Sequence, residues 1–342
     1  MNNNLLAMDI SKSVFHVVGL DADGQVCLRK ALKRNKLLTW FAQQTPVTVC
    51  MEACSTSNYW GRELQKLGFE VRLIPAQFVK PFVQGNKNDF NDALAIAESA
   101  HRPNMHTVPV KSIEQQDQQA IRRIRKQLVD QRVALGNQIR SILAENGLVI
   151  RLGIPQLRVR VPEILEEAEN QLSAVMREAL ARQYEYFMYL SEQIKFYTRQ
   201  LEALVKQNED CQRLLKIPGM GPISTSAFVG YVGDGQRFRR GRDVSASLGL
   251  VPRQHTSADK QLLLGISKRG NRELRTLLIH GARSFLRVAA KKDDRLSRWV
   301  VRLSERVGHN KAAVALANKM ARIAWAVIRK QEPFDPDHAL AA

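Results

Sequence analysis

The sequence predicts a mixed fold, in which an α/β domain is followed by a long helical arm and a mostly helical C-terminal domain. Three observations predict it. Short apolar, β-branched runs alternate with helical patterns up to about residue 105. Apolar residues then recur every seven positions over residues 111–147, and helical patterns fill most of the remaining chain. The length of 342 residues is sufficient for two or three such domains.

The first domain begins with apolar segments in residues 4–20, which a polar break at Ser11–Ser13 divides in two. The DADG sequence at 21–24 is typical of a turn. We therefore expect two antiparallel strands within residues 4–20. The same apolar pattern predicts further strands at 46–53 and 69–76.

Two helices are expected in the same domain. Residues 56–67 carry apolar side chains on one side, and Gly68 follows as a typical helix end. A second helix is expected over residues 91–101, where Asn91 is suited to the N-cap position. This order of strands and helices favours an α/β domain with a mixed sheet, which ends near residue 105.

The expected arm consists of two helical stretches, residues 111–147 and 162–207, on either side of a break at Gly147–Pro162. This arrangement favours an antiparallel helical hairpin or a coiled-coil arm. An intramolecular bundle that needs no partner is the alternative. Both remain open, although we favour contact with another subunit. The apolar residues of the heptad are Ile121, Leu128, Leu135 and Ile142.

The C-terminal part is predicted to be mostly helical. Residues 214–234 have a helix–turn–helix pattern around the sequence PGMG, and the chain is then rich in glycine and arginine to about residue 275. Two more helices are expected, over 284–306 and 310–330, with a break at Gly308. We divide the chain into an α/β domain at 1–105, an arm at 106–210, a C-terminal domain at 211–332 and a tail at 333–342.

The chain carries a large excess of positive charge. Lys and Arg number 52 and Asp and Glu 33, for a net charge of +19, which suits a polyanionic partner. The charge is uneven, because residues 1–110 have a net charge of +3 and residues 111–342 one of +16. The basic remainder is therefore expected to provide most of the contact with nucleic acid.

Other classes of protein are disfavoured. No apolar run approaches the roughly 18 residues of a spanning helix, and the N-terminus lacks the features of a signal peptide. We therefore expect no membrane association and a cytoplasmic location. The four cysteines, which form no CxxC pair, favour reduced thiols over a zinc site or a disulfide framework.

Four carboxylates are candidates for a metal site. Asp9 lies in an apolar strand, Glu52 ends another, and Asp89 and Asp92 are three residues apart at a helix start. A buried, unpaired carboxylate is costly, and a divalent cation can compensate several at once. Oxygen ligands suit Mg²⁺ or Mn²⁺. Each acid alone could be a cap, an ion pair or a charge matched to a helix dipole. Together the four favour a metal centre for phosphoryl transfer.

Two further features point to phosphate. The turn containing Gly219 and Gly221 could aim backbone N–H groups at a phosphate from a helix N-terminus, or it could be an ordinary helix connection. The stretch that follows is basic and rich in glycine, so its backbone can approach a ligand. The cations in it that we expect to contact nucleic acid are Arg239, Arg240, Arg242, Arg253, Lys260, Lys268, Arg269 and Arg272.

Serines within this basic stretch are candidate nucleophiles, because neighbouring arginines can stabilise the charge that develops on a phosphodiester. From the residues alone, Ser245, Ser247, Ser257 and Ser267 are not distinguished. His255 lies two residues before Ser257 and could help to activate it, or could be a polar loop residue.

The motifs resemble those of a known family. GNKNDFNDALAIAE at 85–98 is similar to the motif that carries the last two acids of the DEDD transposases of insertion sequences. LLKIPGMGPISTSAF at 214–228 and the segment 238–282 resemble the C-terminal transposase domain of the same family. The group, insertion-sequence family one-ten, includes the Piv invertase, and its members are also called bridge-RNA-guided recombinases.

The resemblance implies a RuvC-like RNase H fold for residues 1–105, with Asp9, Glu52, Asp89 and Asp92 at the four DEDD positions. The catalytic serine of the family follows a Gly-Leu-x-Pro-Arg segment, which places it at Ser257. The residue after it, Ala258, is commonly a glycine in the family.

The activity that the resemblance implies is the cutting and rejoining of DNA through a covalent phosphoserine intermediate, with help from Mg²⁺ bound to the carboxylates. The metal and Ser257 meet across subunits in that picture, so a homo-oligomer, a dimer or a tetramer, is implied. A structured noncoding guide RNA selects donor and target DNA by base pairing.

Two alternatives remain. A RuvC-like junction nuclease would hydrolyse DNA with water and use the C-terminal domain only for binding. A non-catalytic nucleic-acid-binding protein would not need its acids, and the presence of all four argues against it.

Overall fold

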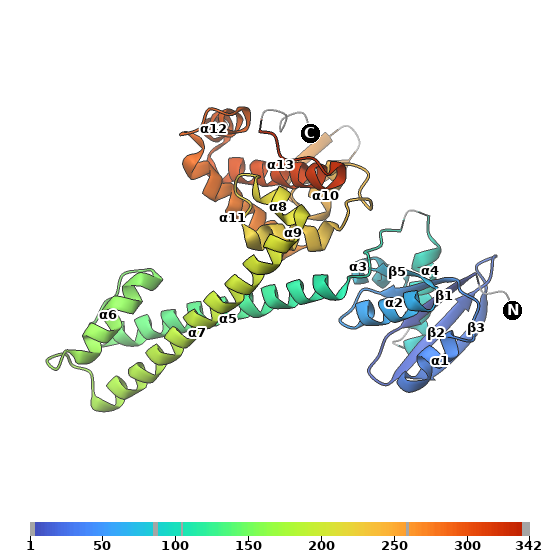
Figure 1. The fold of residues 1–342 in the computed structure, drawn as a ribbon, viewed down its shortest axis with the longest axis horizontal. Coiled ribbons are helices and arrows are strands. Elements are labelled where there is room, and N and C mark those ends of the chain that lie inside the picture. The colour runs from blue at the N-terminus through green and yellow to red at the C-terminus, as the bar shows by residue number, and fades with distance from the viewer. Residues whose placement is uncertain (1–3, 85–87, 104, 258–259, 337–342) are drawn as a thin grey trace. The chain divides into compact units, whose positions relative to one another are not determined.

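The computed structural model describes residues 4–84, 88–103, 105–257 and 260–336 (Figure 1). The side chains of residues 257–261 lie outside the described part. The chain forms two compact units, residues 1–116 and 117–342. The proposed division into three domains and a tail remains a prediction, and each unit is described by itself.

The N-terminal unit is built on one mixed sheet with the strand order β3-β2-β1-β4-β5. β1 pairs with β2 in antiparallel and with β4 in parallel orientation, and β5 continues the parallel half. The strands expected within 4–20, 46–53 and 69–76 are thus confirmed. The five strands are β1 (Leu5–Asp9), β2 (Val14–Leu20), β3 (Val26–Lys33), β4 (Thr48–Glu52) and β5 (Glu70–Ile74).

β3 was not predicted. It lies at one edge of the sheet, and its only buried residue is Leu32, so it lacks the apolar alternation that marks a strand. The DADG sequence forms the turn that leads into it. There the Asp21 carboxylate accepts hydrogen bonds from the backbone N–H groups of Asp23 and Gln25, and Gly24 has a φ of +77°.

Helix α4 begins earlier than predicted. Its N-cap is Asn88, whose side chain accepts a hydrogen bond from the Phe90 N–H at 2.9 Å, and not Asn91. This correction places both Asp89 and Asp92 in the first turn. The helical segments of this unit are η1 (Arg34–Lys36), α1 (Leu37–Phe41), α2 (Ser57–Lys66), α3 (Ala76–Val79), η2 (Lys80–Phe82) and α4 (Asp89–His101).

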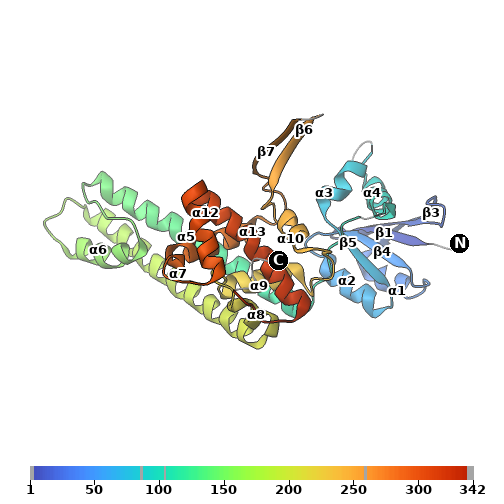
Figure 2. The same cartoon turned by 90° about the horizontal axis from the view of Figure 1, so that it is seen from above.

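The sheet separates two cores, with α2 on one face and α4 on the other (Figure 2). Side chains alternate along a strand. Met8 and Met51 accordingly belong to the core on the α2 face, whereas Ala7 and Cys50 belong to the core on the α4 face. The same alternation places Asp9, two residues after Ala7, on the α4 face.

The arm of the second unit contains three helices, α5 (Ile113–Glu145), α6 (Ile154–Glu166) and α7 (Ala174–Gln207). The first agrees with the predicted helix. The expected break at Gly147–Pro162 is wrong for most of its length, because α6 occupies it and contains Pro162. The second long helix begins at residue 174, after the N-cap Ser173. Figure 1 shows α6 at the far end of the arm from helices α8–α13.

The heptad residues pack mainly within the chain. Leu135 is buried, and Leu128 and Ile142 are half-buried, in a core that α6 and α7 complete. Polar contact joins the two long helices as well, since Arg125 Nε donates to Thr198 Oγ1 at 2.7 Å. This packing agrees with the intramolecular alternative, and contact of the heptad with another subunit remains a prediction.

The remainder of the second unit is a helical domain with one hairpin. The expected helix–turn–helix around PGMG is present as α8 and α9, and the break at Gly308 is confirmed. The single helix predicted over 284–306 is wrong, because α11 ends at Ala289 and α12 begins after the N-cap Asp294. The elements are α8 (Glu209–Leu215), α9 (Pro222–Val232), α10 (Gly241–Ser247), β6 (Pro252–Ser257), β7 (Lys260–Ile266), α11 (Arg272–Ala289), α12 (Arg295–Val307) and α13 (His309–Lys330).

The four cysteines are free thiols, as predicted. Burial raises the pKa of the Cys50 and Cys211 thiols to about 12, so both are protonated and unreactive at neutral pH. Among the described helices, none is both long and apolar enough to cross a membrane.

Candidate functional site

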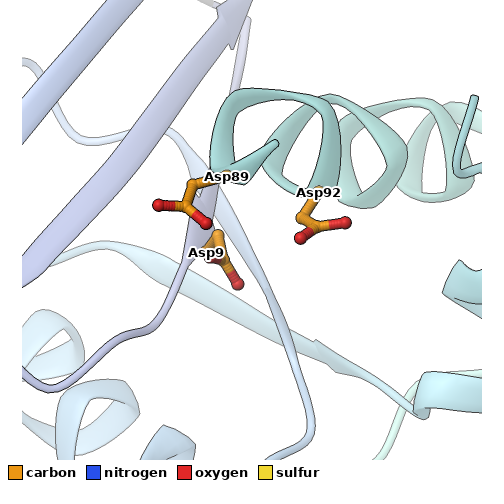
Figure 3. Close-up of side chains that lie close together, drawn as sticks. All are labelled: Asp9, Asp89 and Asp92. Atoms are coloured by element: carbon orange, nitrogen blue, oxygen red, sulfur yellow. The ribbon is translucent and has the colours of Figure 1, made fainter. Parts of the chain in front are cut away.

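Three of the four predicted carboxylates converge. Asp9 ends β1, and Asp89 and Asp92 lie in the first turn of α4, which crosses the same face of the sheet (Figure 3). One carboxylate oxygen from each residue lies within 4.8 Å of the others. Residues that are 80 positions apart in the chain are thus brought to one point by the packing of α4 on β1.

Glu52 lies beside this group. It ends β4, which runs parallel to β1 with Met51 opposite Met8. Glu52 therefore lies next to Asp9, at the carboxyl ends of two neighbouring strands. Burial and the negative charge of Asp92 raise the pKa of Glu52. Glu52 does not reach the tight group of three among the described side chains, but it lies within the range of their charge.

The electrostatics of Asp9 reflect this crowding. Burial raises the pKa of Asp9 most, and the charges of Asp92, Asp89 and Glu52 raise it further. His16 has the opposite effect. Several carboxylates near one point destabilise each other unless a cation offsets their charge. The donor set consists of hard oxygens, so the residues present fit Mg²⁺ or Mn²⁺.

His16 belongs to this site and was not predicted. It lies opposite Asp9 in the β1–β2 pairing, and its Nδ1 is 3.6 Å from Asp89 Oδ2. Its ring contacts the Phe90 ring at a centroid distance of 4.7 Å. In the sequence, His16 lies two residues before Val18, so the two side chains share the α4 face of β2. A single polar residue in an apolar strand gave no further reason to select His16 as a site residue.

Ser257 lies on a different structure. It is the last residue of β6, and its backbone pairs with Lys260 of β7 in a two-stranded antiparallel hairpin. Figure 2 shows this hairpin projecting from the helices around α10. The side chains of Ser257 and Lys260 lie outside the described part, whereas those of His255 and Thr256 are exposed.

The other serines have structural roles. Ser245 is fully buried and donates to the Asn318 carbonyl oxygen at 3.1 Å. Ser247 donates to the Val244 carbonyl oxygen at 2.8 Å and accepts a hydrogen bond from the Tyr231 hydroxyl at 3.0 Å. Both hydroxyls are therefore engaged in hydrogen bonds within the domain.

The PGMG turn is tightly packed. Gly219 has a φ of +85°, and a Cβ there would lie 2.5 Å from the Gly281 carbonyl oxygen of α11. Glycine is therefore required at position 219, because any side chain there would collide with the backbone of α11. Gly221 is the N-cap of α9, and a Cβ there would meet nothing within 4 Å. Of the two, Gly221 has the open position that a phosphate contact needs.

The arginines of the basic stretch fall into two groups. Arg237 lies 4.3 Å from the Phe238 ring centroid and donates to the Tyr231 carbonyl oxygen, and Arg275 is buried. Neither was among the predicted contacts with nucleic acid. The predicted contacts whose side chains the structure describes are all exposed: Arg239, Arg240, Arg242, Arg253, Lys268, Arg269 and Arg272.

Two family models match the chain. A model described as a transposase, of the DEDD type named for IS110, matches residues 6–146, which include all four acids. The model of the transposase IS116/IS110/IS902 family matches residues 211–297, which include Ser257.

Similar proteins cover nearly the whole chain. A protein named probable family 20 transposase from Pseudomonas aeruginosa is 45% identical over 98% of this chain and 100% of its own length. The transposase for insertion sequence element IS1111A from Coxiella burnetii is 45% identical over 96% of this chain and 91% of its own. A pilin gene-inverting protein from Moraxella bovis is 30% identical over 37% of this chain and 39% of its own.

Proposed function

Because the chain belongs to the IS116/IS110/IS902 family of transposases, we propose that it cuts and rejoins DNA through a covalent phosphoserine intermediate at Ser257. The observation that carries the proposal is the convergence of Asp9, Asp89 and Asp92, whose carboxylate oxygens lie within 4.8 Å of one another. The similarity to a pilin gene-inverting protein supports recombination rather than simple cleavage.

The acidic residues would hold the metal. Asp9, Asp89 and Asp92 offer carboxylate oxygens at one point, and Glu52 adds a fourth carboxylate beside them. A bound Mg²⁺ or Mn²⁺ supplies charge stabilisation to a phosphodiester under attack. The residues' own contribution is to fix these oxygens on β1, β4 and α4, three elements held by buried packing on the α4 face.

Ser257 would act as the nucleophile. Its Oγ forms a bond to phosphorus while the bond from phosphorus to one strand oxygen breaks, and that strand leaves with a free hydroxyl group. The serine proton passes to a base. Because the phosphoserine ester conserves the bond energy, attack by a strand hydroxyl in the reverse direction rejoins DNA without ATP.

The basic surface supports a polyanionic partner. Exposed arginines such as Arg239, Arg269 and Arg272 would neutralise the DNA backbone without reading its sequence. Selection of donor and target DNA is assigned to a structured guide RNA, on the strength of the family resemblance. Strand exchange requires at least two cleavage centres, so we expect a homo-oligomer.

The test is to trap the covalent adduct. The full chain is incubated with end-labelled DNA of the element junction, its guide RNA and Mg²⁺, denatured, and the protein–DNA species is mapped by mass spectrometry. We expect the adduct on Ser257, and we expect Ser257→Ala to form neither adduct nor recombinant while it still binds DNA. Ser245→Ala and Ser247→Ala, whose hydroxyls are used in packing, should retain the adduct.

Two results would contradict the assignment. An adduct that persists in Ser257→Ala would exclude this nucleophile, and Thr256→Val would then test its neighbour. Cleavage with no adduct in the wild-type protein would favour the water-using junction nuclease instead.

A further inference from the structure

The N-terminal unit has a cavity that the proposed chemistry does not use. It is open, has a volume of about 720 Å³, and lies where the β1–β2 turn, the end of β3 and the first turn of α2 meet. Its size falls within the roughly 300–1,000 Å³ typical of small-ligand sites. The residues that matter for its chemistry are Lys12, Ser13, Lys33, Arg34, Tyr59 and Trp60.

The cavity is cationic. None of its lining residues is acidic, and Lys12, Lys33 and Arg34 are exposed. None of these three forms an ion pair with any described residue. They belong to a basic cluster, because Lys12 and the five cations within residues 29–36 make up half of the twelve Lys and Arg of residues 1–110. No acid occurs between Gln25 and Met51. The nearly neutral charge of the domain therefore conceals one strongly positive edge.

The cavity is also aromatic. Tyr59 is 45% exposed, and its ring meets the Trp60 ring edge-on at a centroid distance of 5.0 Å. The Arg34 guanidinium lies 4.9 Å from the Trp60 ring centroid, where it extends the ring surface. Trp60 Nε1 is buried and finds no hydrogen-bond acceptor in the part of the chain that the structure describes. A buried indole N–H normally has a partner, so this wall of the cavity has an unused donor.

We propose that this cavity binds an unpaired nucleotide within a single-stranded segment of nucleic acid. An exposed tyrosine ring stacks on the face of a base, which is accessible only when the base is unpaired. Lys12, Lys33 and Arg34 hold the phosphates on either side of that base. The inference extends the proposed function, because it needs nucleic acid as a partner but does not involve the carboxylates or Ser257.

A purely structural explanation covers only part of this arrangement. Lysines on an edge strand prevent pairing with other sheets, which would account for Lys30 and Lys33 on β3. Protection of an edge strand does not account for Lys12, which lies in the β1–β2 turn. It also does not account for the exposed Tyr59 of α2, which lines the same cavity. Three separate elements contribute cations and rings to one hollow, as a ligand site requires.

The test is photochemical crosslinking to the full chain. A short oligonucleotide with a single 5-iodouracil is used as single-stranded DNA, as single-stranded RNA and as a fully paired duplex. We expect irradiation to crosslink the single strands, but not the duplex, to the peptide that contains Tyr59. The DNA and RNA arms identify which strand the site takes, and a crosslink at Tyr59 in either arm supports the proposal.

Affinity provides a second measurement. Loss of one stacked base corresponds to roughly a 5- to 150-fold weakening, so Tyr59→Ala should weaken single-strand binding by about tenfold at this subsite, whereas Tyr59→Trp should retain it. Tyr186→Ala is the matched control, because Tyr186 on the arm is 46% exposed, and this variant should leave binding unchanged.

The salt dependence of binding tests the phosphate contacts. Lys33→Gln should lower the salt slope on single strands by about 0.7. Lys80→Gln, at an exposed lysine away from the cavity, serves as the control.

The outcomes separate this inference from the proposed function. Crosslinks only to peptides of residues 117–342, with active recombinase, would overturn the cavity assignment alone. Equal crosslinking of Tyr59 by duplex and single strand would also overturn it, because stacking would then not be the cause. Absence of any nucleic-acid binding by the wild-type chain would overturn both.

Discussion

The acidic cluster and the hairpin that carries Ser257 are built in opposite ways. Asp9, Glu52 and Asp92 each adjoin a fully buried residue, namely Met8, Met51 and Ala93, so a core fixes these three carboxylates, whereas the side chain of Asp89 is 57% exposed at the start of α4. In the hairpin none of the described side chains, those of residues 252–256 and 262–266, is buried. Its residues Leu262, Leu263 and Leu264 are 55%, 58% and 41% exposed.

The difference concerns preorganisation. Carboxylates of like charge repel one another, so they stay close together only if the packing of the strands and helix that carry them stabilises the domain by more than this repulsion costs. An isolated two-stranded hairpin is marginally stable in water, and consecutive exposed leucines add apolar surface that its own domain does not cover. The acidic cluster therefore lies within a packed frame of its own unit, whereas the described side chains of the hairpin are exposed or half-buried.

The largest expected effect is on the acidic cluster. Asp9→Asn should reduce recombination by at least about 10²- to 10³-fold, because it removes one metal-binding charge. Without metal, the same change should raise the free energy of unfolding, since it removes a charge that burial and the repulsion from Asp92 and Asp89 destabilise. Mg²⁺ should raise the melting temperature of the wild-type protein and not that of Asp9→Asn.

Asp23→Asn is the control for this prediction, because Asp23 is exposed in the β2–β3 turn of the same domain. Recombination by Asp9→Asn at the wild-type rate in Mg²⁺ would contradict the metal assignment.

Packing around the two regions should respond differently to loss of an apolar side chain. Met51→Ala, beside Glu52 and fully buried, should cost about 2–5 kcal/mol of stability. Leu263→Ser in the hairpin should change it by less than about 0.5 kcal/mol. Urea unfolding measures both. A large cost for Leu263→Ser would mean that the hairpin has a packing partner in solution.

The base of the hairpin is the exception to its loose packing. Gly270 has a φ of +72°, and a Cβ there would lie 1.8 Å from the Ser247 carbonyl oxygen. Gly270→Ala should therefore cost about 2 kcal/mol or more. Gly265→Ala, within β7, meets nothing within 4 Å and should be close to neutral. Equal melting temperatures for the two variants would contradict the idea of a rigid base.

Two arginines three residues apart give the smallest and most specific contrast. Arg275 is buried and donates from Nη1 to the carbonyl oxygens of Leu248 and Arg269, each at 2.9 Å, so Arg275→Gln should cost about 1–3 kcal/mol of stability. Arg272 is exposed, so Arg272→Gln should leave stability unchanged and lower the salt slope of duplex binding by about 0.9. Thermal unfolding and salt titration separate the two roles, and the reverse pattern would refute them.

Local pattern in the sequence was sufficient for much of the fold. The apolar runs of β1, β2, β4 and β5, the long α5 and the break at Gly308 were all predicted, because each element's periodicity reports directly which side is buried. The four acids were also selected from the sequence as candidates, Asp9 and Glu52 because a carboxylate in an apolar strand is costly, and Asp89 and Asp92 because of their three-residue spacing at a helix start.

Tertiary structure decided the rest. Only the pairing of β2 with β3 makes an exposed, basic segment a strand, and only the packing of α6 and α7 shows what the heptad at Leu128 and Leu135 contacts. The positions of His16 beside Asp89, and of Lys12 beside Tyr59, likewise depend on contacts between distant segments. The physical reason is that periodicity along a chain specifies which face is buried, whereas the partner of that face is fixed by the packing of the whole domain.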